Sequence, residues 1–221
     1  MRKTLRPVTL LTFALLASAG CASAPRGAAS AQSASASASA TATADTTPHT
    51  YTAADAEFMN GMISHHAQAL LMAGWAASHG ASPPIRTLTD RIINAQKDEI
   101  VAMQKWLRDR HLPVPEPNPH GMTMNMGGMQ HEMLMPGMLT EDQLKQLDAA
   151  RSKEFDRLFL TFMIQHHQGA VTMVNNLFNT NGAAQDISVY KLASDVSADQ
   201  TTEIERMQKM LASMVFSTDT P

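Results

Sequence analysis

Two pairs of adjacent histidines stand in apolar, helix-like parts of this sequence. His65 and His66 lie in "MISHHAQA", and His166 and His167 lie in "MIQHHQGA". In each segment a methionine precedes the pair by three and four residues, which places its thioether on the same face of a helix. Imidazole with thioether is a soft ligand set, which suits Cu(I) better than magnesium, calcium or manganese. The two methionines are Met62 and Met163.

Duplication of the motif favours metal ligation over an ordinary core role. A lone buried histidine is usually hydrogen-bonded, and a buried methionine usually fills a gap. If the histidines served packing alone, however, an aliphatic residue could replace either of them in one copy of the repeat. Adjacent helical residues point about 100° apart, so one imidazole of each pair should face the bundle axis and the other the flanking helix. The sequence leaves open whether the pairs share one site or form two.

The repeat extends beyond the histidines. "QKDEIVAMQKWL", which starts at Gln96, matches "QTTEIERMQKML", which starts at Gln200. Apolar residues recur at three- and four-residue steps in both parts of each repeat, a spacing typical of amphipathic helices. Two helical hairpins can bury their apolar stripes against each other, which predicts an all-α, four-helix bundle made of two repeated hairpins. We expect no sheet, because no sustained period-two run of β-branched residues is present.

Helix-breaking and capping residues divide the chain. Gly80 and Pro83-Pro84 are expected to end the first helix, prolines from Pro113 onward to end the second, and 179–182 to end the third. Thr140 to Gln143 is a capping box for a short helix that leads into the second repeat. The expected organisation is one bundle domain over 51–216, with hairpin repeats at 51–112 and 140–216 and a Met/His/Pro-rich loop at 113–139.

Four carboxylates recur at equivalent positions of the two repeats. Asp55 and Asp156 lie near helix starts, where their negative charge interacts favourably with the helix dipole. Glu99 and Glu203 lie on the partner helices, where each can orient an imidazole by a hydrogen bond. We expect these residues to support metal ligands rather than to bind the metal directly. A di-iron carboxylate site would require Glu-x-x-His, which the sequence lacks, and this argues against a ferroxidase or oxygenase.

The connection between the repeats holds seven of the chain's 17 methionines. Interspersed glycines and prolines predict a mobile loop. Thioethers on such a segment can wrap a soft ion, and they stay available in an oxidising compartment where free thiols would be oxidised. A methionine-rich surface for hydrophobic partners is the alternative. The candidate auxiliary ligands are His120, Met122, Met124, Met126, Met129, His131, Met133, Met135 and Met138.

The N-terminus is typical of an export signal. Basic residues precede an apolar run at 8–19, and small residues lead to Cys21, the only cysteine. Cys21 stands where a bacterial lipoprotein carries its lipid, although Ser18 replaces the usual leucine, and plain cleavage nearby is the alternative. We expect a signal peptide at 1–20, an Ala/Ser/Thr-rich disordered tether at 21–50, and a protein of the periplasm or cell envelope that contacts the membrane only through a lipid anchor. The net charge of −3 leaves no basic face for nucleic acid.

Both histidine segments and both Glu-Ile-x-x-Met segments closely resemble the bacterial secreted family known as domain of unknown function 305, from Tyr51 to about Met214. The resemblance implies a ferritin-like bundle, and some members of that family look like exported copper-binding proteins linked to copper tolerance. It also implies that Met72 and Met173 join the ligand set. The first repeat departs from the family's Gly-Ala after the histidine pair, because it has Gln68-Ala69.

The sequence therefore predicts an exported protein that sequesters or carries copper, as Cu(I) or Cu(II), and contributes to copper tolerance. Its expected partners are copper ions and other copper-handling proteins of the envelope, and no catalytic residue is legible. One alternative is a metal-dependent oxidase or hydrolase that uses the histidine pairs with Glu99 or Glu203, which predicts an open coordination position and turnover. Another is a structural or adaptor bundle, which predicts that leucine in place of His166 and His167 leaves metal binding unchanged.

Overall fold

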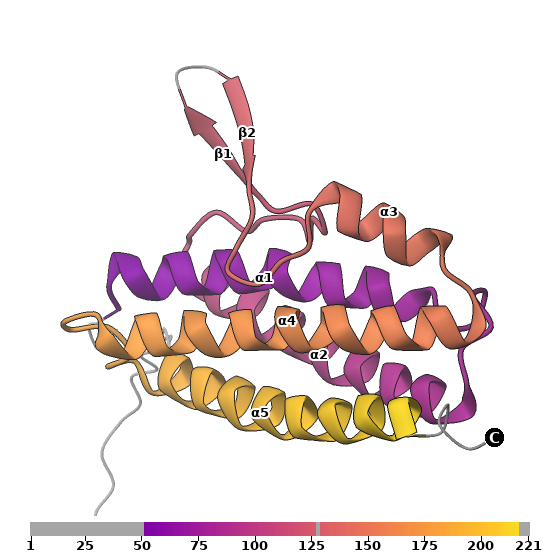
Figure 1. Cartoon of the computed structure of the whole chain (residues 1–221). Coiled ribbons are helices and arrows are strands. Elements are labelled where there is room, and N and C mark those ends of the chain that lie inside the picture. Colours follow the sequence, from indigo (N-terminus) through magenta and orange to yellow (C-terminus); the bar gives the residue numbers. More distant parts are fainter. Residues whose placement is uncertain (1–50, 127–128, 217–221) are drawn as a thin grey trace, which may run out of the picture. The chain divides into compact units, whose positions relative to one another are not determined.

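The computed structural model describes residues 51–126 and 129–216, and the side chains at 123–131 and 215–216 are not described. The expected signal peptide, the tether and Cys21 lie outside these residues. Figure 1 shows the described elements in chain order. They are α1 (Ala53–Gly74), α2 (Pro83–Asp109), β1 (Met122–Met126), β2 (Met129–Met133), α3 (Glu141–Ala149), α4 (Ser152–Asn179) and α5 (Ile187–Phe216).

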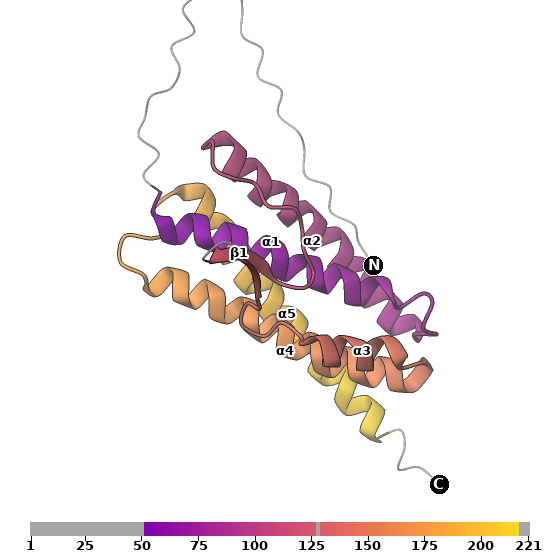
Figure 2. The same cartoon turned by 90° about the horizontal axis from the view of Figure 1, so that it is seen from above.

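Two helical hairpins form the bundle. Helix α1 packs against α2, α4 packs against α5, and contacts between α1 and α4 join the two hairpins. Both views show α1 and α4 lying side by side (Figures 1 and 2). The short helix α3 rests on α4. The predicted all-α bundle of two repeated hairpins is therefore confirmed.

Local sequence explains where the helices begin. Thr140 and Gln143 form the predicted capping box at α3, and Thr52 forms a second capping box with Asp55 at α1. Pro83 and Pro84, which were expected to end the first helix, open α2 instead. Proline suits the first helical turn because the amide hydrogen that it lacks has no partner there. Helix α1 itself ends earlier, at Gly74.

Two buried aspartates tie each hairpin to the turn of the other. Asp55, at the start of α1, accepts a 2.7 Å hydrogen bond from the backbone amide of Ala184, between α4 and α5. Asp156, at the start of α4, accepts hydrogen bonds of 3.2 and 3.3 Å from the amide of Ser82, between α1 and α2. The start of α1 therefore lies beside the end of α4, and the start of α4 lies beside the end of α1. The two helices thus run antiparallel. The contacts of these aspartates are with backbone amides and Thr52, not with imidazoles.

Buried methionines divide between two hydrophobic clusters. Met62 of α1 shares one cluster with Met173 of α4, and Met72 of α1 shares the other with Met163 of α4. On each helix the histidine pair lies between the two methionines in sequence. The antiparallel packing of α1 against α4 thus places a thioether from each helix on either side of the histidines.

The expectation of no sheet was wrong for the connection between the repeats. Strands β1 and β2 form an antiparallel pair that projects from the helices in Figure 1. The sequence Met-Thr-Met-Asn-Met of β1 alternates between apolar and polar residues, which is the period of a strand. A Gly-Gly pair, typical of tight hairpin turns, separates the strands, but residues 127–128 are not described. The expected loop therefore contains a hairpin at 122–126 and 129–133.

Among the described residues, no helix combines the length and the apolar character that a membrane span needs.

Candidate metal centre

The two histidine pairs meet at the interface between α1 and α4. The ring centroids of His65 and His166 lie 3.8 Å apart, and the rings are tilted by 36°. Within each pair the ring centroids are 6.3 and 6.2 Å apart. All four side chains are fully buried. The structure thus answers the question that the sequence left open, because both pairs belong to one histidine cluster.

The second histidine of each pair reaches a glutamate on the flanking helix. His66 Nε2 lies 2.6 Å from Glu99 Oε2 of α2, and His167 Nε2 lies 2.8 Å from Glu203 Oε2 of α5. The expected division is present: His65 and His166 face each other, whereas their neighbours face the partner helices. The expected hydrogen bonds between the two glutamates and imidazoles are also present, and they occur at equivalent positions of both repeats.

These hydrogen bonds fix which nitrogen of each ring carries a lone pair. A carboxylate only accepts, so Nε2–H of His66 and of His167 donates, and a neutral ring then has its lone pair on Nδ1. His65 is fixed in the same way, because its Nε2 donates to the carbonyl oxygen of Pro136 at 3.1 Å. Metal-binding histidines usually show this arrangement, with one nitrogen anchored to a carboxylate or carbonyl. Within the cluster, the unpartnered buried nitrogens are Nδ1 of His65, His66, His166 and His167, and Nε2 of His166.

A fifth buried histidine shows what an ordinary structural role looks like in this bundle. His79 Nε2 donates to the Asp148 backbone carbonyl and carboxylate at 2.9 and 3.0 Å, and its Nδ1 lies 2.9 Å from Ser78 Oγ. Both ring nitrogens of His79 are therefore satisfied. A buried polar atom without a partner costs roughly 1–3 kcal/mol. The histidine cluster carries such atoms and His79 does not, which separates the cluster from structural histidines.

Burial favours the neutral form of His65, His166 and His167. Removal from water lowers the pKa of His65 and of His166 well below its ordinary value of 6.5, and neighbouring imidazoles lower it further. Burial also lowers the pKa of His167, although its hydrogen bond to Glu203 opposes this change. A neutral imidazole is the form that binds metal, so these three imidazoles are ready to accept a cation at neutral pH.

One segment of the connection, 135–139, crosses the cluster. The Gln68 side chain exchanges hydrogen bonds with the backbone of Leu139, with Leu139 N donating at 2.6 Å and Leu139 O accepting at 3.1 Å. A Cβ atom on Gly169 would lie only 1.9 Å from Pro136 O, so glycine is needed for this close approach. Gln68 and Gly169 occupy equivalent positions of the two repeats. In the first repeat Gln68 holds segment 135–139 by hydrogen bonds, and in the second repeat Gly169 leaves space for the same segment. This difference explains why the first repeat departs from Gly-Ala.

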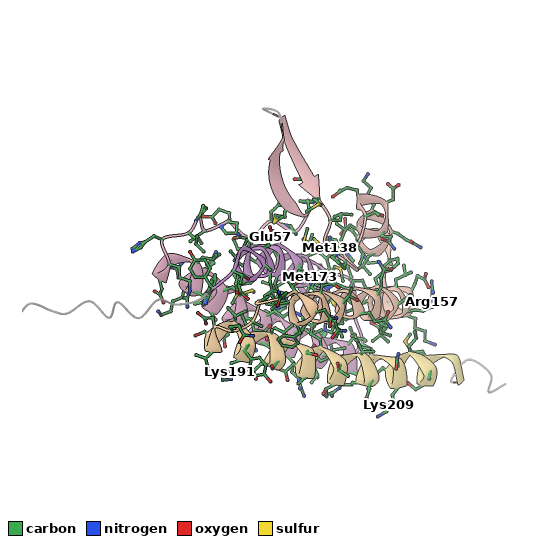
Figure 3. The ribbon with its side chains drawn as sticks, turned by 90° about the vertical axis from the view of Figure 1, so that its left-hand side faces the viewer. Glu57, Met138, Arg157, Met173, Lys191 and Lys209 are labelled. Carbon is green, nitrogen blue, oxygen red and sulfur yellow. The ribbon has the colours of Figure 1, made fainter. Side chains whose placement is uncertain are left out.

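The methionines expected as ligands are buried on the same two helices as the histidines. Met62, Met72 and Met163 are fully buried and Met173 is 8% exposed. Figure 3 shows Met173 and Met138 below the β hairpin, on the side opposite Lys191 and Lys209 of α5. No three His, Cys, Asp or Glu side chains among the described residues are arranged to hold a metal ion. Met62 and Met163 lie three and four residues before the two histidine pairs, so each thioether shares a helix face with imidazoles.

The auxiliary residues of the connection are only partly described. His120 is exposed and its Nδ1 lies 2.5 Å from Glu141 Oε1. Met133 is exposed, whereas Met135 is half-buried and Met138 is buried. The backbone register of the β hairpin pairs Met122 with Met133, Met124 with His131 and Met126 with Met129.

The family model "Domain of unknown function (DUF305)" matches residues 55–211. The chain therefore belongs to the DUF305 family, as the sequence resemblance indicated. A mimivirus protein, "Uncharacterized protein L153" of Acanthamoeba polyphaga mimivirus, is 38% identical over 58 residues, which cover 26% of this chain and 38% of that protein's length.

Solved structures with the same fold include two bacterial DUF305 proteins. One from Streptomyces coelicolor is 28% identical, with a TM-score of 0.61 over 73% of this chain and 93% of that chain. One from Deinococcus radiodurans is 27% identical, with a TM-score of 0.60 over 73% and 97%. CopM in its Cu(II)-bound form is 32% identical, with a TM-score of 0.55 over 72% and 96%. CopM has also been solved with Cu(I) and with Ag bound.

The lowered pKa values predict that acid destabilises the metal-free protein. Below about pH 6.5 the histidines of the unfolded chain take up protons, while those of the folded chain stay neutral down to their lowered pKa values. The free energy of unfolding should therefore fall as pH drops below 6.5, by up to roughly 1.4 kcal/mol per pH unit for each histidine. Urea denaturation between pH 7 and 5.5 measures this slope. His166→Leu should make it shallower, and an equal slope in both proteins would contradict the assignment.

Proposed function

We propose that this protein binds copper at the histidine cluster and sequesters or carries it in the cell envelope, where it contributes to copper tolerance. Nitrogen donors come from both histidine pairs and sulfur donors from the buried methionines that flank them. Glu99 and Glu203 hold the imidazoles in position. The proposed ligands are Met62, His65, His66, Met72, Met163, His166, His167 and Met173.

The observation that carries this proposal is the set of buried ring nitrogens without partners. Three rings of the cluster are anchored through Nε2, and each leaves a buried Nδ1 lone pair that no other group satisfies. His166 has no partner at either nitrogen, so all four rings carry an unpartnered Nδ1, which is unfavourable for folding unless a ligand uses these atoms. The matched anchoring in both repeats argues that the lone pairs serve that purpose.

The donor types favour copper over harder metals. Thioether sulfur with imidazole nitrogen suits Cu(I), and imidazole also binds Cu(II), for which affinity is highest among the divalent ions. Similarity to CopM, which has been solved with Cu(I), Cu(II) and Ag bound, supports the same choice. Complete burial of the donors favours storage or transport rather than turnover, because catalytic sites keep an open coordination position.

We propose the β hairpin as an auxiliary site for soft metal. Its backbone register sets Met or His positions opposite one another across the strands at three alternate pairs, which therefore share one face of the hairpin. Thioethers stay neutral and available in an oxidising compartment, which suits an exported protein. Export itself is supported by the N-terminal sequence and by similarity to a Streptomyces DUF305 protein designated as secreted. A lipid on Cys21 would hold the protein at the membrane surface.

Removal of the histidine cluster should remove tight copper binding. In an anaerobic titration with Cu(I) against a competing chelator, alanine at all four histidines should abolish the tight equivalents that the bundle holds. The His65→Leu/His166→Leu variant tests the same point in a protein that should fold, because leucine replaces three buried nitrogens that lack partners, at the cost of the hydrogen bond from His65 to Pro136. His79→Ala is the matched control, since His79 is a buried histidine with satisfied nitrogens.

Cu(I) equivalents that are undiminished in both cluster variants would contradict the proposal. Circular dichroism and urea denaturation establish that each variant is folded before it is titrated. The adaptor alternative predicts unchanged copper binding in the leucine variant, so one titration separates the two functions.

Excision of the β hairpin should lower copper stoichiometry without loss of the bundle site. The cut should run from Met122 to Met133, because Gly121 lies beside Met133 and Leu134, so the ends can be joined there. Residues 135–139 must stay, since they pack over the histidine cluster. Fewer Cu(I) equivalents with unchanged helicity is the expected result, measured by chelator competition and circular dichroism. Unchanged stoichiometry would overturn the auxiliary site.

A further inference from the structure

A small pocket lies between α2 and α5, on the far side of the histidine cluster's glutamates. It has a volume of about 100 Å³, and Glu99 and Glu203 contribute to its wall. Each of these glutamates retains some exposure, 15% for Glu99 and 13% for Glu203, while its carboxylate contacts a fully buried imidazole. One carboxylate from α2 and one from α5 therefore lie between the pocket and the histidine cluster.

The pocket is strongly acidic. Asp199 lines it together with the two glutamates, and Arg91 is the cationic side chain among its lining residues. Burial raises the pKa of the Asp199 carboxyl, and the charges of Glu99 and Glu203 raise it further, which indicates a field of negative charge. Such a field concentrates cations and speeds their arrival.

Two buried amides in the pocket lack partners. Gln96 and Gln200 occupy equivalent positions of the repeats, and each is only 3% exposed. Neither the oxygen nor the nitrogen of the Gln96 amide has a hydrogen-bond partner, and the Gln200 oxygen has none. Both side chains line the pocket. These polar atoms point to a polar ligand, and the volume holds roughly three water molecules.

The other approach to the cluster is covered. Segment 135–139 lies over α1 and α4, and Pro136 O accepts the hydrogen bond from His65 Nε2. Gly169 allows this segment to contact the backbone of α4 directly. A cation that reaches the imidazoles from the side of the β hairpin must displace this segment, whereas the α2–α5 pocket already reaches the anchoring glutamates.

We propose that the α2–α5 pocket binds a hydrated divalent cation and is the route by which Cu(II) reaches the histidine cluster. This inference rests on the proposed function. Carboxylate and amide oxygens suit a cation that keeps its water. Within the described residues no three carboxylates converge as a chelate, so the pocket holds the ion through its water shell. The ion then passes between Glu99 and Glu203 to the imidazole nitrogens.

The test is the rate of Cu(II) uptake, followed by stopped-flow quenching of tryptophan fluorescence. The quadruple histidine-to-alanine variant gives the baseline, so that only quenching that depends on the cluster is counted. Asp199→Asn removes a pocket charge, and Gln96→Leu with Gln200→Leu replaces the unpartnered amides by apolar groups. Glu57→Gln is the matched control, because Glu57 lines a different pocket, beside Pro136 and Met173 (Figure 3).

Both pocket variants should take up Cu(II) about threefold more slowly or worse, with less dependence on salt in Asp199→Asn and the same final stoichiometry. Glu57→Gln should match the wild-type rate. Wild-type rates in both pocket variants, or slow uptake in Glu57→Gln alone, would overturn the route and leave the proposed function standing. Quenching identical in the wild type and the quadruple variant would overturn Cu(II) binding at the cluster and this route with it.

Discussion

An imidazole–carboxylate hydrogen bond inside each hairpin organises the whole centre. His66 donates to Glu99 and His167 donates to Glu203, so the second histidine of each pair is held toward its partner helix. Because adjacent helical residues point about 100° apart, the first histidine must then face the interface between α1 and α4. The same bonds leave the Nδ1 lone pairs free inside the protein. Loss of either glutamate would leave a buried imidazole without its anchor.

The histidine cluster lowers the stability of the fold that holds it. Buried nitrogens without partners weaken the fold, and the imidazoles with lowered pKa values weaken it further below about pH 6.5, so other contacts must offset them. The two aspartate ties between hairpins and the apolar clusters around Met62 and Met163 provide such contacts. The duplication is not perfectly symmetric, because a single connection crosses the cluster. It supplies Pro136 to His65 and leaves both nitrogens of His166 without partners.

Local patterns in the sequence were sufficient for the helices, the Thr140 cap and the glutamate–imidazole pairs, because each depends on spacing within one or two helices. Whether the histidine pairs meet depends on the antiparallel packing of α1 against α4, which spacing does not encode. The β hairpin was missed although Met122 to Met126 alternate, because methionine is not a typical strand residue. The roles of Gln68 and Gly169 also depend on a distant segment, 135–139, so the difference between the repeats was the only sequence signal.

The most direct test is long-range ¹H–¹⁵N NMR of the histidine side chains before and after addition of one equivalent of Cu(I), which is diamagnetic. The account predicts that Nδ1 resonances of the cluster shift on metal binding, while Nε2 of His66 and His167 stay protonated against Glu99 and Glu203. Cluster resonances that do not move while those of other histidines do would contradict it. Loss of the proton from Nε2 of His66 or His167 would contradict the proposed mode of coordination.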